Sequence, residues 1–416
     1  VCYMKRKGIG GLTFWTLERD DSTGVGCGRG KFPLIRTARI VCYVNNWGQY
    51  RQGKGRFLPE NIDAMVCTHV VYAYAWIKNG VISPVRPEKE ESENWREGLY
   101  HRVVHMKIFN PNMKVILAVG GYSAGSAGFE GVSQNSETRK AFSIHAVRFL
   151  HERKFDGLEV DWQYVTADFR LNNLLLLQAL RSAFDEDARV TGRQRLLLTV
   201  ALPSGKKHID DGYGDEIESL IKFIDFVSLL TYDFHGSWDV NTGFHTALYA
   251  RPGDTGEESY LNVDWVVRYY VSLGVPKELI NIGVATYGRS FTLKEAHHNY
   301  VGAAVMRPGE PGPYTNQPGL LAYYEICDLK ASGGRVVRDR VQMATYLYKD
   351  YQWVSYDDIA TVTDKTCYVR DGGYGGILLW SLDYDDFTGD SCHEGRYPLM
   401  TVVFLILDNS NMKVCP

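Results

Sequence analysis

The stretch Asp156-Gly157-Leu158-Glu159-Val160-Asp161-Trp162-Gln163-Tyr164 says most about the fold of this 416-residue chain. Most of it belongs to a short apolar run, residues 155–162, of the kind that forms a buried β-strand. Seven further runs of the same kind lie before and after it. We therefore predict eight strands, at residues 39–44, 68–76, 113–120, 155–162, 195–202, 226–231, 280–286 and 376–382.

Helical patterns separate these runs, most clearly at residues 136–152 and 169–189. Strands that are apolar on both faces and followed by helices indicate a parallel sheet covered by helices. Eight such units in about 360 residues fit an α/β protein with a closed (β/α)8 TIM barrel better than an open sheet. Residues 290–355, between the seventh and eighth strands, are rich in Gly, Pro and Tyr and predict a small inserted α+β lobe.

The two ends of the chain resemble each other. Residues 1–35 align without gaps with residues 366–400, and 15 of the 35 positions are identical. A period of 366 − 1 = 365 residues equals a whole domain, since solenoid repeats have units of roughly 20–50 residues. We predict that residues 1–36 are the tail of a preceding homologous copy and residues 37–400 a complete copy. Residues 401–416 would end the last helix and begin a linker, with further homologous domains in the same polypeptide.

Composition excludes several classes of function. Lys and Arg number 46 against 49 Asp and Glu, a net charge of −3 without a basic run, so no nucleic-acid partner is expected. The longest apolar stretch, residues 402–407, is far shorter than the roughly 20 residues of a membrane-spanning helix. The eight cysteines are scattered and form no CxxC pair, which favours disulfides and an extracellular, secreted protein.

Aromatic and charged residues gather where the predicted strands end. In (β/α)8 barrels the chemistry lies at the C-terminal ends of the strands. A rim of carboxylates, an Arg and aromatic faces suits a neutral, hydroxylated ligand such as a saccharide. Any single aromatic could instead fill the barrel mouth as ordinary core. The rim residues are Tyr43, Trp47, Tyr74, Tyr122, Asp156 to Gln163, Tyr232, Asp233, Tyr287, Arg289 and Trp380.

Residues 156–164 resemble the signature D-G-x-D-x-D-W-E-Y of the family 18 glycoside hydrolases, which comprise chitinases and chitinase-like lectins. Segments 41–47, 118–121, 232–238, 286–291 and 380–383 agree with the same family. The resemblance implies a (β/α)8 barrel with an inserted lobe and a groove for polymers of N-acetylglucosamine. It also implies the disulfides Cys42–Cys67 and Cys327–Cys392.

The departures from the signature bear on activity. In active relatives the last Glu protonates the glycosidic oxygen while the substrate's own N-acetyl group attacks the anomeric carbon. Here Gln163 occupies that position, and its amide cannot act as the acid. Loss of a positioned general acid typically removes a factor of about 10²–10⁴ in rate. Asp161, which orients the acetamide in the family, is retained, whereas Glu159 replaces the first inner Asp.

The resemblance also implies roles for the rim residues. Trp380 corresponds to the floor beneath the central sugar, and Tyr232 and Asp233 to residues that hold the N-acetyl group. For Asp161 a purely structural role, as a buried carboxylate satisfied by Tyr232 and backbone donors, is the alternative. Asp156 and Glu159 complete the catalytic set with Asp161, Gln163 and Tyr232. The expected sugar-binding residues are Tyr43, Trp47, Tyr122, Asp233, Trp238, Tyr287, Arg289 and Trp380.

The leading hypothesis is a secreted chitinase-like protein that binds chitin or chito-oligosaccharides without efficient hydrolysis. It would need no metal or organic cofactor; His297 and His298 lack an i,i+4 partner histidine, which argues against a metal site. One alternative is a chitinase in which this copy is a binding module beside active tandem copies. Another is a structural or signalling protein that uses the barrel as a scaffold.

Two details stay open at the level of sequence. Gln163 could be an engineered knockout, but Glu159, Val165, Leu230 and Tyr122 also depart from the family, which favours natural loss. For the remaining cysteines, a Cys367–Cys415 bridge is geometrically reasonable because both residues are expected at the N-terminal face of the barrel. Cys27 would then be free or joined to Cys2.

Overall fold

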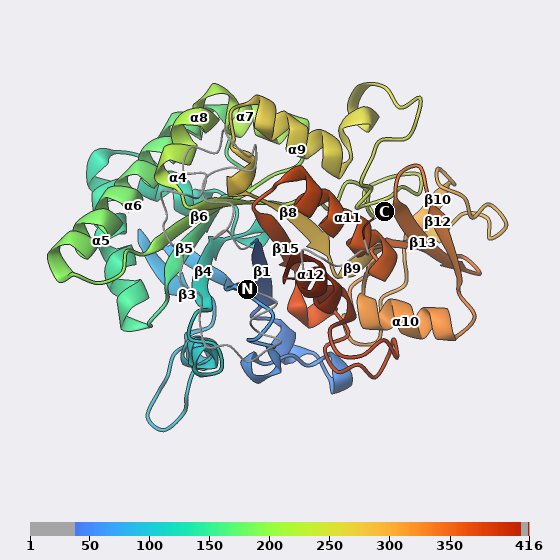
Figure 1. Ribbon diagram of the computed structural model, residues 1–416, viewed down its shortest axis with the longest axis horizontal. Helices are drawn as coiled ribbons and strands as arrows, with labels where there is room; N and C mark the ends of the chain where they lie inside the picture. Colours follow the sequence, from blue (N-terminus) through green and yellow to red (C-terminus); the bar gives the residue numbers. More distant parts are fainter. Residues whose placement is uncertain (1–37, 409–414, 416) are drawn as a thin grey trace, which may run out of the picture.

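The computed structural model describes residues 38–408 and Cys415 (Figure 1). Eight parallel strands pair in the order β1-β15-β8-β7-β6-β5-β4-β2, and β1 also pairs with β2, which closes the barrel. This confirms the (β/α)8 TIM barrel. The strands are β1 (Arg39–Asn45), β2 (His69–Lys78), β4 (Lys114–Gly120), β5 (Gly157–Asp161), β6 (Leu197–Leu202), β7 (Phe226–Leu229), β8 (Ile280–Ala285) and β15 (Gly376–Trp380). The short β3 (Val81–Pro84) pairs antiparallel with β2.

The barrel strands form where the sequence is apolar on both faces. Every residue of β8 is buried, and in β4 only the first residue is not. Such strands exclude water from both sides and must be covered by helices. The exceptions include four polar residues that are nevertheless 0% exposed, namely Glu159, Thr199, Ser228 and Asn281. Thr199 and Ser228 both donate to Glu159 at the site described below.

Helices surround the barrel, and the two predicted ones are confirmed as α5 (Ser136–Glu152) and α6 (Arg170–Thr191). Asn135 caps α5 by accepting from the backbone N–H groups of Glu137 and Thr138. None of the helices within the described residues is both long and apolar enough to cross a membrane. The other helices are α2 (Pro87–Glu90), α3 (Leu99–His105), α4 (Ala127–Ser133), α7 (Lys206–Gly212), α8 (Ile217–Leu220), α9 (Val263–Ser272), α11 (Ile359–Gly372) and α12 (Pro398–Asp408).

The predicted lobe is present between β8 and β15 and is seen at the right of the barrel in Figure 1. Its antiparallel sheet has the order β10-β9-β14-β13-β12, and β11 pairs with β9. Phe291, Leu293 and Trp353 belong to its separate hydrophobic core. The elements are β9 (Tyr287–Leu293), β10 (Val305–Pro308), β11 (Leu320–Ala322), α10 (Tyr323–Ala331), β12 (Arg335–Asp339), β13 (Ala344–Lys349) and β14 (Gln352–Tyr356).

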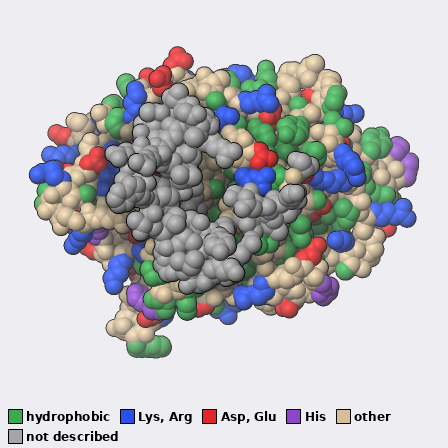
Figure 2. All heavy atoms as spheres, in the orientation of Figure 1, with side chains coloured by type: hydrophobic (Ala, Val, Ile, Leu, Met, Phe, Trp, Pro, Cys, Tyr) green, Lys and Arg blue, Asp and Glu red, His purple; other side chains and the backbone are tan. Residues whose placement is uncertain are grey.

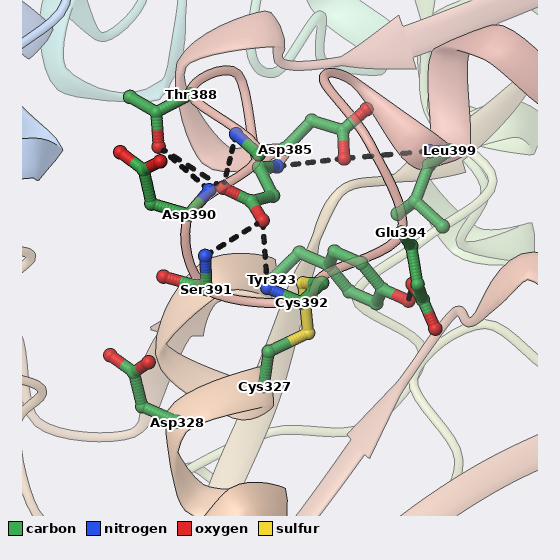
Figure 3. Close-up of a disulfide and its surroundings, with 12 residues drawn as sticks. Tyr323, Cys327, Asp328, Asp385, Thr388, Asp390, Ser391, Cys392, Glu394 and Leu399 are labelled. Carbon is green, nitrogen blue, oxygen red and sulfur yellow. Dashed lines mark hydrogen bonds between the residues drawn. A yellow bond between two sulfur atoms is a disulfide. The ribbon is translucent and has the colours of Figure 1, made fainter.

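Three disulfides tie these parts together. Cys42–Cys67 and Cys327–Cys392 are formed, which confirms the two pairings that the resemblance implies, and Cys367–Cys415, which the sequence left open, is formed as well. Figure 3 shows the second bridge, which joins α10 to the loop after β15. In that loop the Asp386 carboxylate accepts from the backbone N–H groups of Ser391 and Cys392, at 3.1 and 2.8 Å. Cys2, Cys27 and the repeat at residues 1–36 lie outside the described residues, so the predicted domain boundaries remain predictions.

Candidate functional site

Glu159 lies at the centre of the barrel on β5 and is completely buried. Its carboxylate accepts hydrogen bonds from the hydroxyl groups of Tyr43 on β1, of Thr199 on β6 (3.1 Å) and of Ser228 on β7 (3.0 Å). Burial raises the pKa of Glu159 to about 7, and the three hydroxyl donors only partly oppose that rise. The longer acid at this position is therefore held by donors from three other strands of the barrel, of which only β6 is adjacent to β5.

Asp161, the last residue of β5, lies next to Gln163. The Gln163 side-chain N–H group donates to Asp161 Oδ1 at 2.9 Å, and the Tyr74 hydroxyl donates to Oδ2 at 2.7 Å. Burial raises the pKa of Asp161 to about 6, and both bonds work in the opposite direction. The expected structural partner of Asp161 was Tyr232. Among the described residues Tyr232 Oη instead has no hydrogen-bond partner, although it is buried.

Trp380, which ends β15, lies at the centre of an aromatic cluster at the barrel rim. Its ring centroid is 5.2 Å from that of Tyr43, 5.9 Å from Tyr74, and 6.4 Å from both Tyr232 and Trp47. The indole is half-buried, so part of it remains accessible. A partly exposed indole framed by other rings offers an apolar surface on which a sugar ring can stack.

A second charged cluster lies on the lobe side of the rim. Arg289 binds the Asp233 carboxylate with two N–H groups, at 2.7 and 2.5 Å, and the Tyr287 hydroxyl donates to it at 2.5 Å. Burial alone would raise the pKa of Asp233, but Arg289 and His245 outweigh it and hold that pKa well below its usual range. Asp233 is therefore ionised and paired at neutral pH.

Three more of the expected sugar-binding residues are accessible at loops around the rim. Trp47 is 37% exposed, Trp238 57% and Tyr122 78%. The Arg289 guanidinium lies 5.3 Å from the Trp238 ring centroid, within cation–π range. Exposed aromatic rings around the rim offer further faces on which a ligand ring can stack.

Asp156 does not belong to this cluster, which corrects its place in the catalytic set. It precedes β5, whereas Asp161 ends that strand, so about five residues at roughly 3.3 Å each separate them. The Asp156 carboxylate pairs with Lys107 Nζ at 2.8 Å and accepts from the Val115 backbone N–H at 2.7 Å. It stabilises the opposite end of the barrel.

Several contributing residues were not assigned from the sequence. The sequence predicts Tyr74 at the rim without indicating a role for it, and the structure shows that its hydroxyl donates to Asp161. Thr199 and Ser228 gave a usable signal, because polar residues inside otherwise apolar strands need a buried partner. His245 gave no signal; it is fully buried, and neither ring nitrogen has a hydrogen-bond partner within the described part of the chain.

No cofactor site is apparent at this rim from the described side chains. The inner carboxylates are already bonded to hydroxyl and amide donors. A cavity of about 670 Å³ lies beside α9 and α11, and its lining, which includes Tyr249, Arg268 and Tyr368, shares no residue with the rim cluster. The rim thus combines buried carboxylates with the aromatic cluster around Trp380.

The barrel, its inserted lobe and the polar rim define the scaffold of a glycoside hydrolase. The family described as glycosyl hydrolases family 18 matches residues 39–385. The chain belongs to this family, whose members among its relatives are chitinases and chitinase-like proteins.

The relatives include proteins with and without reported activity. Chitotriosidase-1 of Mus musculus is 40% identical over 371 residues, covering 87% of this chain and 76% of the relative. Chitinase-3-like protein 2 of Homo sapiens is 40% identical over 367 residues, covering 88% and 91%. The immunomodulatory active chitinase of Trichuris suis has a TM-score of 0.85 at 36% identity, covering 89% of this chain and 100% of that structure.

Human YKL-39 is named a pseudo-chitinase with retained chitooligosaccharide binding properties. Its structure has a TM-score of 0.82 at 38% identity and covers 88% of this chain and 98% of its own. The family is therefore established, and similarity alone leaves open which of the two behaviours this chain has.

Proposed function

We propose that this domain binds chitin or chito-oligosaccharides at the barrel rim and does not hydrolyse them efficiently. The observation that carries the proposal is the contact between Gln163 and Asp161: an amide, which has no acidic proton, lies where the family signature has its general acid. The aromatic cluster around Trp380 and the accessible Trp47 and Trp238 support binding.

Neither inner carboxyl group is placed to replace the missing acid. With a pKa of about 7, Glu159 is partly protonated at neutral pH, but it is fully buried and surrounded by three hydroxyl groups. Asp161 is only 1% exposed, and both of its oxygens accept hydrogen bonds. A general acid must come within about 3 Å of the oxygen that it protonates. Hydrolysis would therefore lack a proton donor.

Hydrolysis and binding measured on one purified preparation test the proposal. We expect turnover of a chromogenic chitobioside at the background rate, together with calorimetric binding of the N-acetylglucosamine tetramer. Sustained hydrolysis that co-purifies with the protein would overturn the first half. Absence of binding would favour the scaffold alternative.

Trp380→Ala locates the binding surface. Loss of stacking should weaken binding of the tetramer by about 1–3 kcal/mol, whereas Trp380→Phe keeps an aromatic face and should lose less. Calorimetry on both variants, with circular dichroism as the check on folding, measures the difference. An unchanged affinity in the folded Ala variant would move the binding surface away from this rim.

We also propose that the protein is secreted, which the three disulfides support. The proposed tandem arrangement rests on the similarity of residues 1–35 to residues 366–400. Sequencing of the complete transcript tests it, and a neighbouring copy with Glu at the position of Gln163 would make this domain a binding module of a chitinase.

A further inference from the structure

Just after β9 the lobe carries three potential metal ligands, Glu295, His297 and His298. Among the described residues they are the one group of three whose ligand atoms all lie within 4.8 Å of one another. His297 Nε2 is 3.2 Å and His298 Nδ1 3.5 Å from the same oxygen, Glu295 Oε2. All three residues are exposed; Figure 2 shows histidine side chains grouped at the right-hand edge of the molecule.

These distances fit ligands around an ion better than hydrogen bonds. An N–H···O hydrogen bond in proteins is usually about 2.9 Å long. Ligands held at roughly 2.0–2.1 Å around a tetrahedral zinc ion lie about 3.3 Å apart. The two Glu–His distances of 3.2 and 3.5 Å bracket this value. The ligand atoms of all three residues lie within 4.8 Å of one another, and rotation of these exposed side chains can bring them onto one ion.

The backbone that carries the ligands is already fixed. The His298 N–H group donates to the Glu295 carbonyl at 3.1 Å and closes a turn between the two ligands. The backbone N–H of Lys294 donates to the Ala304 carbonyl at 2.9 Å on one side of this turn. On the other side the indole N–H of fully buried Trp353 donates to the Asn299 carbonyl at 3.2 Å. A turn anchored to the lobe core presents its ligands at little entropic cost.

Two imidazoles and one carboxylate are a ligand set that suits zinc and neighbouring divalent metals, with water in the remaining position. We propose that Glu295, His297 and His298 form a surface binding site for a divalent transition-metal ion of the zinc class. The absence of an i,i+4 partner histidine excludes only a site on one face of a helix. These ligands instead come from a turn, where neighbouring residues can converge. The site is independent of saccharide binding at the rim.

Zinc titration of the tag-free protein tests the site, because a histidine tag would bind the metal itself. We expect calorimetry with zinc chloride to show about one high-affinity equivalent per chain. Glu295→Gln should weaken that equivalent at least about tenfold, and the double variant His297→Ala/His298→Ala should abolish it. With Cu²⁺ as the probe, the electron paramagnetic resonance spectrum of the protein should show nitrogen ligands that the double variant lacks.

The chain offers a matched control in α3. His101 and His105 are also exposed, with ring centroids 5.9 Å apart, and Glu97 lies 3.5 Å from His101. Because His101 and His105 are spaced i,i+4 on one helix, they are the rival pair for zinc among the described residues. If the turn holds the high-affinity ion, His101→Ala/His105→Ala should retain the zinc equivalent that His297→Ala/His298→Ala loses. Equal zinc binding by the wild type and the His297/His298 variant, or no binding by the wild type at 100-fold molar excess, would overturn the proposal.

Discussion

At position 163 a single atom separates an amide from a carboxylic acid, and the structure shows what that change does locally. The amide N–H group donates to Asp161 without competing for a proton. A carboxyl group in its place would lie within hydrogen-bond distance of Asp161, so the pair would share one proton and titrate together. Reversing the substitution thus changes the electrostatics of both residues.

Gln163→Glu alone is expected to restore little hydrolysis, because Glu159 still differs from the family Asp and remains fully buried beneath the pair. The double variant Gln163→Glu/Glu159→Asp should exceed the single variant in turnover of a chromogenic chitobioside. The single variant Glu159→Asp serves as the control and should stay at background. Full activity in Gln163→Glu alone would show that the change at position 159 is immaterial.

Tyr74 and Tyr72 on β2 provide a matched pair for the rim hydrogen bond. Tyr74 donates to buried Asp161, whereas Tyr72 Oη is buried with no partner among the described residues. Tyr74→Phe should lower the free energy of unfolding by about 1–2 kcal/mol, because a buried carboxylate loses a donor. Tyr72→Phe should change it by less than about 0.5 kcal/mol, since no bond is lost. Urea unfolding of both variants makes the comparison, and equal effects would contradict it.

At the scale of elements, the eight barrel strands could be predicted because each is a short apolar run between helical patterns. Their ends were less exact: β5 was predicted over residues 155–162 but its paired residues are Gly157–Asp161. The same imprecision about the ends of β5 explains why Asp156 was wrongly expected in the catalytic set. A motif that is contiguous in sequence spans a strand, and a strand carries its two ends to opposite faces of the barrel.

The candidate site was predictable where a residue lies at a strand end, as for Trp380 and Asp233. It was not predictable where the contact crosses the barrel. The bond from Tyr74 to Asp161 spans 87 residues of sequence. His245 meets Asp233 at 3.7 Å only because the segment after β7 folds back over the lobe. Such contacts depend on the closed barrel and leave no local pattern.

Helix α11 is linked to the segment after β14 by a fully buried ion pair. Lys365 Nζ contacts both oxygens of Asp357 at 2.6 Å, and both side chains are 0% exposed. Lys365→Met would leave the Asp357 charge unpaired and should lower the free energy of unfolding by about 3–5 kcal/mol. Lys365→Met/Asp357→Leu removes both charges and should recover most of that loss in urea unfolding. A double variant as unstable as the single one would show that packing, not charge, dominates.

At the scale of the whole molecule, buried ionisable groups act in opposing directions on stability. Burial raises the pKa of Glu159 and Asp385 to about 7, whereas it lowers the pKa of His69 to about 3. A buried carboxyl group with a raised pKa stabilises the folded protein while it is protonated, and this stabilisation is lost as the pH increases. Buried neutral histidines lose stability as the pH falls. The effects of the carboxyl groups and of the histidine on the pH dependence of stability oppose each other. Variants of single groups therefore reveal each effect better than the pH dependence of the whole protein does.

Glu159→Gln isolates one of these groups. The folded protein holds a proton on Glu159 that the unfolded chain releases above about pH 4.5, so this contribution to stability is lost as the pH rises through about 7. Gln cannot ionise. Relative to the wild type, the variant should therefore gain about 3 kcal/mol in unfolding free energy between pH 5 and 8. Urea unfolding across that range measures the difference, and a constant offset would contradict the raised pKa.

The Cys327–Cys392 bridge has a consequence for cleavage of the chain. Its two cysteines are 65 positions apart in sequence, and the loop between them runs from α10 through the last lobe strands to the loop after β15. Arg340 and Val341, between β12 and β13, are exposed within that span. A protease that nicks the bond after Arg340 would leave two fragments joined through sulfur, and the pieces would part on a gel only after reduction. A surface cut in the lobe would therefore not release its outer strands.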